Sequence, residues 1–179
     1  MSVESKDLNE SEPTGGAAIA TPPVAIETAR LHVVLLEPEI ADNTGAIGRT
    51  CVAAGAALWL VRPLGFRLDD SRRRRAGLDY WPHLALRVVD SIDDVIRHFG
   101  SDRLWWFSTK APRLYTSASF RNGDAFVFGP ESRGLPARLI EPAVASNRAL
   151  AIPMRPEARS LNISNSVAVG LYEAVRQLG

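Results

Sequence analysis

Short apolar segments alternate with segments of helical character from residue 31 onward, and this alternation constrains the fold more than any other feature. The patterns predict strands over 31–38, 58–63, 84–90, 103–109, 124–131 and 148–154. They predict helices over 43–56, 91–100, 136–143 and 166–178, the second of them capped by Ser91. Apolar strands that alternate with helices are typical of a parallel sheet covered on both faces. The sequence therefore predicts an α/β fold, with any ligand at the carboxyl ends of the strands.

Residues 1–29 differ in composition from the rest of the chain. They mix Ser, Glu, Pro, Gly and Ala with a period of neither 2 nor 3.6, which predicts a disordered, acidic leader. The remaining residues, 30–179, are long enough for one ordinary domain with its own core. We expect Trp105 and Trp106, in the strand over 103–109, to belong to that core.

The charge is unevenly distributed between these two parts. Residues 1–29 carry five acids and one lysine, so removing their net charge of −4 from the total of +1 leaves +5 for residues 30–179. Lys110 is the only lysine after residue 29, so this basic excess is almost all arginine. The planar guanidinium fork suits phosphate, which makes a polyanionic partner plausible.

Several classes of protein do not fit the composition. Cys51 is the only cysteine, so no intrachain disulfide is possible, and no CxxC pair or His-rich spacing indicates a metal. No apolar run approaches the roughly 18 residues that cross a bilayer, and the N-terminus lacks a secretory pattern. We expect a cytoplasmic protein that uses neither a membrane nor a metal.

Polar residues gather after four of the predicted strands, over 37–49, 108–110, 129–136 and 154–165. In the first, Asn43 or Thr44 would cap a helix, and Gly45 and Gly48 would admit a backbone or a ligand. Taken alone, that stretch is explained more simply by a capped helix with a surface arginine at position 49. A Rossmann cofactor loop does not, because GxGxxG is absent.

The loops over 129–136 and 154–165 are harder to explain as connections. "FGPESRGLP" has glycines that would leave amide N–H groups facing a ligand, although a turn with a solvated Glu–Arg pair is the simpler alternative. Residues 159–166 contain more polar side chains than one helix cap requires. The helix that follows has an apolar stripe that faces either its own sheet or a partner subunit, made of Val167, Leu171, Ala174, Val175 and Leu178.

Taken together, "NTGAIGRT", "FGPESRGLP" and "IPMRPEARSLNISNSVAVGLYEAVRQLG" resemble the three motifs of the SPOUT methyltransferases. More closely, with "EPEIADNTG" and "RRAGLDYW", the chain is similar to the bacterial tRNA (cytidine/uridine-34)-2′-O-methyltransferases, which act on the wobble nucleotide of certain leucine tRNAs. The resemblance runs from about residue 31 to residue 179 and leaves only the leader uncovered. It implies a C-terminal trefoil knot, a homodimer whose subunits complete each other's active sites, and S-adenosyl-L-methionine as cofactor.

The same resemblance implies roles for particular residues. The cofactor shell would be Phe107, Ser108, Thr109, Gly129, Glu131, Ile152, Met154, Ser160, Leu161 and Asn165. The catalytic positions would be Asn43, Arg49, Glu131, Ser160 and Asn162. Arg49 would contact the ribose 2′-oxygen or the adjacent phosphate, and electrostatic stabilisation fits a guanidinium better than a role as base.

The segment "DSRRRRAGLDYW" is the predicted contact with the tRNA anticodon stem-loop. Its four arginines are either a solvated helix start or phosphate contacts, and its two aromatic residues would stack on an unpaired base; the six are Arg72, Arg73, Arg74, Arg75, Tyr80 and Trp81. Two other functions stay open at this point. One is 2′-O-methylation of another tRNA position or of ribosomal RNA, and the other is noncatalytic RNA binding by the same fold.

Overall fold

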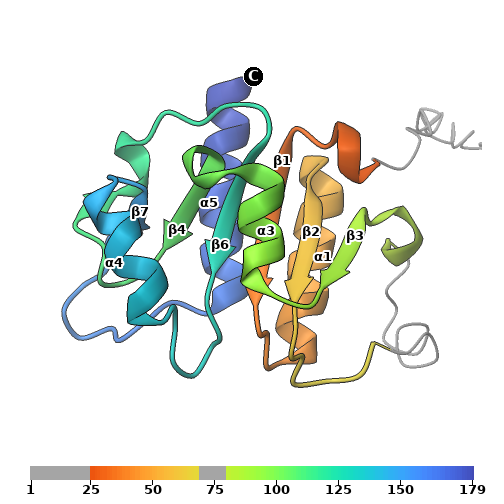
Figure 1. Cartoon of the computed structure of the whole chain (residues 1–179), viewed down its shortest axis with the longest axis horizontal. Helices are drawn as coiled ribbons and strands as arrows, with labels where there is room; N and C mark the ends of the chain where they lie inside the picture. The colour runs from red at the N-terminus through yellow and green to blue at the C-terminus, as the bar shows by residue number, and fades with distance from the viewer. Residues whose placement is uncertain (1–24, 69–79) are drawn as a thin grey trace, which may run out of the picture.

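In the part of the chain that the structure describes, seven strands form a central parallel sheet, in the order β3-β2-β1-β6-β4-β7-β5. The computed structural model describes residues 25–68 and 80–179, and the arrowheads of the strands point to one edge of the sheet (Figure 1). The strands are β1 (Leu31–Leu36), β2 (Ala57–Val61), β3 (Leu86–Val89), β4 (Leu104–Phe107), β5 (Arg113–Leu114), β6 (Asp124–Phe128) and β7 (Ala149–Ala151). The predicted α/β class is confirmed.

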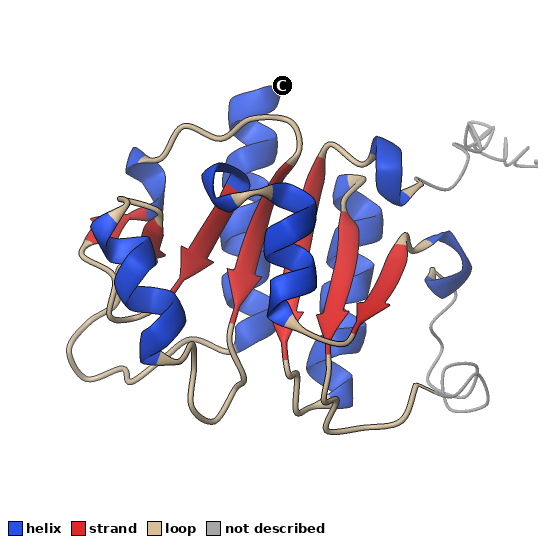
Figure 2. Ribbon diagram, viewed as in Figure 1, coloured by secondary structure: helices blue, strands red, loops and turns tan. Residues whose placement is uncertain are grey.

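Helices cover both faces of this sheet (Figures 1 and 2). One face carries α1 (Ala41–Ala54) and α5 (Ile163–Leu178), and the other carries α3 (Ile92–Phe99) and α4 (Ala137–Ala145). The described residues also form four single-turn 3-10 helices, one before β1 and three in connections: η1 (Ile26–Thr28), η2 (Trp81–His83), η3 (Ser101–Arg103) and η4 (Tyr115–Ser117). None of the helices within 25–68 and 80–179 has the length and apolar character needed to cross a bilayer.

Successive side chains of a strand point to opposite faces of the sheet, so they pack into two separate cores. In β1, Val33 and Leu35 pack into the core beneath α1 and α5, whereas Val34 and Leu36 pack beneath α3 and α4. All six residues of β1 are buried. Apart from His32, the strand is apolar because both of its faces are covered, as the sequence pattern predicts.

The apolar stripe of α5 faces its own sheet. Val167, Leu171 and Ala174 are fully buried in the core that α5 shares with α1. Val169 and Tyr172, on the other side of the helix, are 36% and 49% exposed. Of the two readings of this stripe, packing against the chain's own sheet is confirmed.

Helix starts agree with the sequence in one case and differ in two. Ser91 caps α3 in a capping box with Asp94, as predicted. The predicted cap of α1 is wrong, because the cap position is Ile40 and both Asn43 and Thr44 lie in the first turn. Helix α5 begins three residues earlier than predicted, since the side chain of Asn162 accepts a hydrogen bond from the Ser164 backbone N–H.

Candidate active site

Three loops at the carboxyl edge of the sheet enclose a cleft of about 490 Å³, which is within the usual size of a small-molecule site. They follow β4, β6 and β7, and residues from β1–α1 reach the same cleft. A smaller inner cavity of about 90 Å³ adjoins the cleft. The two share Phe107, Ser108, Thr109, Phe128, Ser160, Leu161 and Ser166 in their linings.

Nine of the ten residues predicted as a cofactor shell line these two spaces. Five of them are in the shared lining, Gly129 and Glu131 line the cleft, and Ile152 and Met154 line the inner cavity. Asn165 differs, because it lies exposed on the first turn of α5. Ser166, one turn after the cap of α5, lines both spaces in place of Asn165, and it belongs to the same polar run of the sequence.

The lining combines apolar surface with hydroxyl groups. Phe107, Phe128, Ile152 and Leu161 offer apolar contacts, and hydroxyls come from Ser108, Thr109, Ser160 and Ser166. Such a lining suits a ligand with a flat apolar ring beside groups that need hydrogen bonds. Within residues 25–68 and 80–179, no group of three or more His, Cys, Asp or Glu side chains is placed to hold a metal ion.

A chain of hydrogen bonds joins three of the predicted catalytic residues at the cleft. The Nδ2 group of Asn162 donates to Oδ1 of Asn43 at 3.0 Å, and Nδ2 of Asn43 donates to Oε1 of Glu131 at 3.1 Å. Oε2 of Glu131 accepts the backbone N–H of Glu39 at 2.9 Å, so this carboxylate lies against the N-terminus of α1. The predicted grouping of Asn43, Glu131 and Asn162 thus corresponds to residues in direct contact, and Ser160 lines the same cleft.

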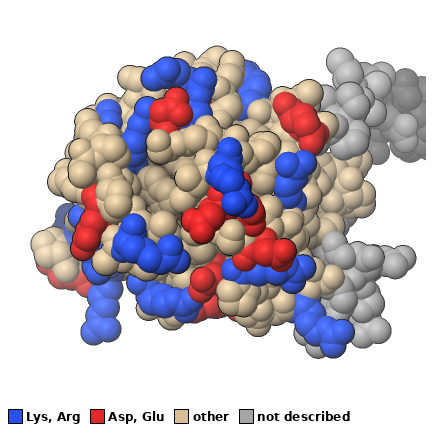
Figure 3. Space-filling view, viewed as in Figure 1, with Lys and Arg blue, Asp and Glu red and all other residues tan. Residues whose placement is uncertain are grey.

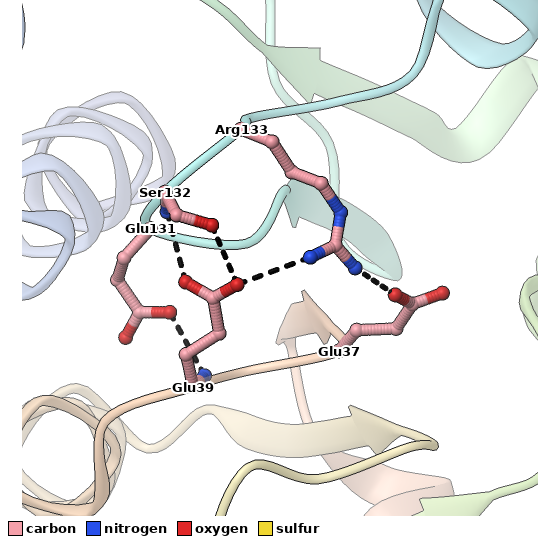
Figure 4. Close-up of polar contacts among 5 residues, drawn as sticks. All are labelled: Glu37, Glu39, Glu131, Ser132 and Arg133. Carbon is pink, nitrogen blue, oxygen red and sulfur yellow. Dashed lines mark hydrogen bonds and ion pairs between the residues drawn. The ribbon is translucent and has the colours of Figure 1, made fainter.

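A second set of contacts links the β1–α1 loop to the β6–α4 loop and was missed by the sequence reasoning (Figure 4). The carboxylate of Glu39 accepts hydrogen bonds from the backbone N–H and the hydroxyl of Ser132, at 2.9 and 2.6 Å, and from Arg133 at 3.1 Å. Arg133 also pairs with Glu37. The two hydrogen bonds from Ser132 hold the pKa of the Glu39 carboxyl below its usual value.

The β6–α4 loop folds tightly on itself at Gly129. A Cβ atom at this position would lie 2.3 Å from the carbonyl carbon of Gly134 and 2.4 Å from the backbone nitrogen of Leu135. Gly134 has a φ of +67°, which favours glycine. The two glycines of "FGPESRGLP" are therefore needed for the shape of the loop that lines the cleft.

Arg49 is not brought to the cluster of Asn43, Glu131 and Asn162. It is six residues beyond Asn43 on α1, about 9 Å along the axis and on another side of the helix. Its exposed guanidinium lies over the ring of Tyr80, with Cζ 4.8 Å from the ring centroid. Within one subunit, Arg49 thus lies against Tyr80, whereas Asn43, Glu131 and Asn162 bond to one another.

The aromatic pair predicted to stack on RNA is only partly available. Tyr80 is 9% exposed, and its hydroxyl donates to the Gly45 carbonyl at 2.6 Å, so this ring presents little free surface to a base. Trp81 is half-buried, and a Cβ on Gly48 would lie 3.2 Å from its ring. Gly48 therefore makes room for side chains of residues 80–84, and the backbone carbonyl of Gly45 accepts the hydrogen bond from Tyr80. The cluster Arg72–Arg75 lies outside the described residues, as do residues 1–24 of the predicted leader.

The face that carries α3 and α4 is not uniformly basic. Lys and Arg side chains alternate there with Asp and Glu (Figure 3). Trp105 and Trp106 of β4 are both buried, which confirms the prediction that they belong to the core.

Comparison with known proteins places these features in context. The model of the SpoU rRNA methylase family matches residues 30–172. The tRNA (cytidine(34)-2′-O)-methyltransferase of Saccharophagus degradans is 47% identical over 148 residues, which cover 83% of this chain and 96% of that protein. A protein solved in a study of the 2-OH methylation of C/U34 on tRNA is 46% identical, with a TM-score of 0.74 and coverage of 83% and 95%.

A more distant structure shares the fold. The SpoU methyltransferase AviRb of Streptomyces viridochromogenes, solved in complex with AdoMet, is 24% identical, with a TM-score of 0.70 and coverage of 87% of this chain and 60% of that protein. The likeness thus extends to proteins of low sequence identity, in which the arrangement of strands and helices is retained.

Proposed function

Since the chain belongs to the SpoU rRNA methylase family, we propose that it transfers a methyl group from S-adenosyl-L-methionine to the ribose 2′-oxygen of nucleotide 34, the wobble nucleotide, of tRNA. The observation that carries this proposal is the hydrogen-bonded chain of Glu131, Asn43 and Asn162 at the edge of the cleft. The names of the relatives, which match over most of their length, support the choice of nucleotide 34.

The residues of the cleft fit S-adenosylmethionine. Its adenine would lie against the apolar side chains of Phe107, Ile152 and Leu161, and its ribose and amino-acid portions would bond to loop backbone groups and to the hydroxyls of Ser108 and Ser160. When bound, the cofactor supplies an electrophilic methyl group. The protein has to hold the acceptor oxygen in line with that group and help to remove its proton.

The chain's own residues divide this work. Asn43 and Asn162 present amide groups to the substrate ribose, and Glu131 fixes the orientation of the Asn43 amide. Arg49 stabilises the negative charge that develops on the 2′-oxygen. It does so as a cation and not as a base, because a guanidinium rarely gives up its proton.

We propose that the protein is a homodimer in which the partner's copy of this arginine serves the cleft. The distance along α1 between residue 49 and Asn43 supports this arrangement, because one subunit does not bring them together. We also propose that the C-terminal segment is threaded as a trefoil knot. In support, the loops 129–135 and 159–163 line one cleft, and α5 then returns to pack against α1.

The substrate would be the anticodon stem-loop of leucine tRNAs, with cytidine or modified uridine at position 34, and the reaction would take place in the cytoplasm. Arg72–Arg75 are proposed to contact RNA phosphates. Trp81 remains the proposed stacking residue.

The test is mass-spectrometric mapping of 2′-O-methylated nucleotides in tRNA from a strain that lacks the gene. We expect nucleotide 34 of leucine tRNAs to lose its methyl group and to regain it when the gene is restored. If the deletion strain keeps the 2′-O-methyl group at nucleotide 34 and shows no other change in methylation, the assignment is contradicted. A loss at a different nucleotide would instead identify a different RNA target, and a failure to bind S-adenosylmethionine in calorimetry would indicate a noncatalytic protein.

A further inference from the structure

Glu39 both accepts hydrogen bonds from the β6–α4 loop and donates one to it, and the proposed methyl transfer gives this residue no role. Its carboxylate accepts two hydrogen bonds from Ser132 and one from Arg133, and its own backbone N–H donates to Glu131 (Figure 4). These contacts join residue 39 to residues 92 to 94 positions away in the chain. Each loop therefore satisfies polar groups of the other.

The hydrogen bonds from Ser132 are the strongest of the contacts that Glu39 makes with residues 131–133, which together form a bridge between the two loops. The Glu39 side chain is 30% exposed, so its carboxylate is partly shielded from water, and bonds from N–H or O–H groups to a carboxylate are stronger than neutral ones. Arg133 is 59% exposed, and exposed ion pairs contribute little. Loss of the carboxylate would leave the Ser132 N–H and hydroxyl to find water, and the loop would lose its fixed position against α1.

The place of Glu131 depends on this bridge. One carboxylate oxygen of Glu131 accepts a hydrogen bond from the Glu39 N–H, and the other accepts one from the Asn43 amide. The amide oxygen of Asn43 in turn accepts a hydrogen bond from Asn162. A shift of the loop at residue 131 would thus move the Asn43 amide. Misplacement of a positioning group by about 1 Å is enough to cost about 100-fold in rate.

We propose that Glu39 is a positioning residue for methyl transfer, which holds residues 131–133 against the N-terminus of α1 and so sets the place of Glu131 beside the cleft. This inference rests on the proposed function. Glu39 acts through Glu131 and the loop, which also lines the cleft. Its loss should therefore affect both cofactor affinity and the rate of transfer.

Glu37 offers a matched control. It is the same kind of side chain, two residues earlier, and it pairs with the same Arg133. Among the described residues, Arg133 is the one hydrogen-bond partner of its carboxylate. A substitution at Glu37 thus removes the ion pair to Arg133 without touching Ser132 or Glu131.

The experiment uses the full chain with S-adenosylmethionine and a leucine tRNA transcript that has cytidine at position 34. For Glu39→Ala we expect kcat to fall at least about tenfold and the Kd for S-adenosylmethionine to rise at least about threefold. Glu39→Gln should be intermediate, because the amide oxygen still accepts from Ser132 while the charge is lost. Glu37→Gln should stay within about twofold of the wild type in both quantities.

A double-mutant cycle separates positioning from a general loss of stability. In a Glu131→Ala background, Glu39→Ala should change kcat by less than about twofold, because its effect passes through Glu131. If the same loss appears in both backgrounds, or if Glu37→Gln reproduces it, the inference is overturned. Ser132→Ala removes one of the bonds to Glu39 and takes the place of Glu39→Ala if that variant does not fold.

The two proposals fail in different ways. A wild-type protein that transfers no methyl group to tRNA would defeat the proposed function, and the S-adenosylmethionine affinities of the Glu39 variants would then still show whether Glu39 holds residues 131–133 in place beside the cleft. Affinity and kcat of both Glu39 variants equal to those of the wild type would defeat the inference while leaving the function intact.

Discussion

His32 shows how burial changes a single titratable side chain far from the cleft. It is 5% exposed, its Nδ1 accepts a hydrogen bond from Trp59 Nε1 at 3.2 Å, and its ring lies 4.8 Å from that of Phe99. Burial, followed by the nearby His98 and Arg87, lowers the pKa of His32 from 6.5 to about 4. Protonation would also remove the acceptor that Trp59 uses, so the structure holds this histidine neutral.

This burial predicts a dependence of stability on pH. The unfolded chain binds a proton at residue 32 below about pH 6.5, whereas the folded chain does so only below about pH 4, so stability falls as the pH decreases through this interval. The loss is at most about 3 kcal/mol. Urea unfolding between pH 7 and 4 should show a steeper fall for the wild type than for His32→Gln, whose amide oxygen can still accept from Trp59. Equal slopes in the two proteins would contradict the assignment.

At the scale of elements, the β6–α4 loop is shaped by a close approach of its own backbone at Gly129. Gly129→Ala would force backbone atoms apart, and we expect a loss of about 1–3 kcal/mol in stability together with weaker binding of S-adenosylmethionine, by about tenfold or more. Thermal unfolding and calorimetric titration measure the two effects.

Gly123→Ala is the control for this prediction. Gly123 has a φ of +85° with open space around it, at the other end of β6. The substitution there should cost backbone strain of about 1–3 kcal/mol without a change in cofactor affinity. If Gly129→Ala binds S-adenosylmethionine as tightly as the wild type, the loop adapts, and the close approach of its backbone at residue 129 is not required for cofactor binding.

At the scale of the whole molecule, the separation of Arg49 from Asn43 leads to a prediction about the proposed dimer. Neither Arg49→Ala nor Asn43→Ala should be active alone. If each site takes its arginine from the partner, a heterodimer of the two variants contains one intact site, and random mixing should restore about a quarter of the wild-type activity. No recovery after subunit exchange, or a monomer in sedimentation at micromolar concentration, would contradict a shared site.

Much of the fold follows from local pattern. The apolar run of β1 predicts a strand buried on both faces, because each of its residues has to lie against a helix layer. Ser91 predicts the start of α3 because a cap and its partner are three residues apart. The polar run 159–166 marks part of the cleft, since it exceeds what one cap requires.

What the tertiary structure decided are the contacts between residues far apart in the chain. The start of α1 has the Glu131 carboxylate beside it in place of a cap from Asn43, Glu39 finds its partners in Ser132 and Arg133, and Tyr80 is buried against Gly45. No local pattern encodes these pairs, because they depend on which loops the order of strands brings to one edge of the sheet. The sequence by itself therefore determined the class of fold and the segments that form the cleft, and only the packed structure decided which side chains act together there.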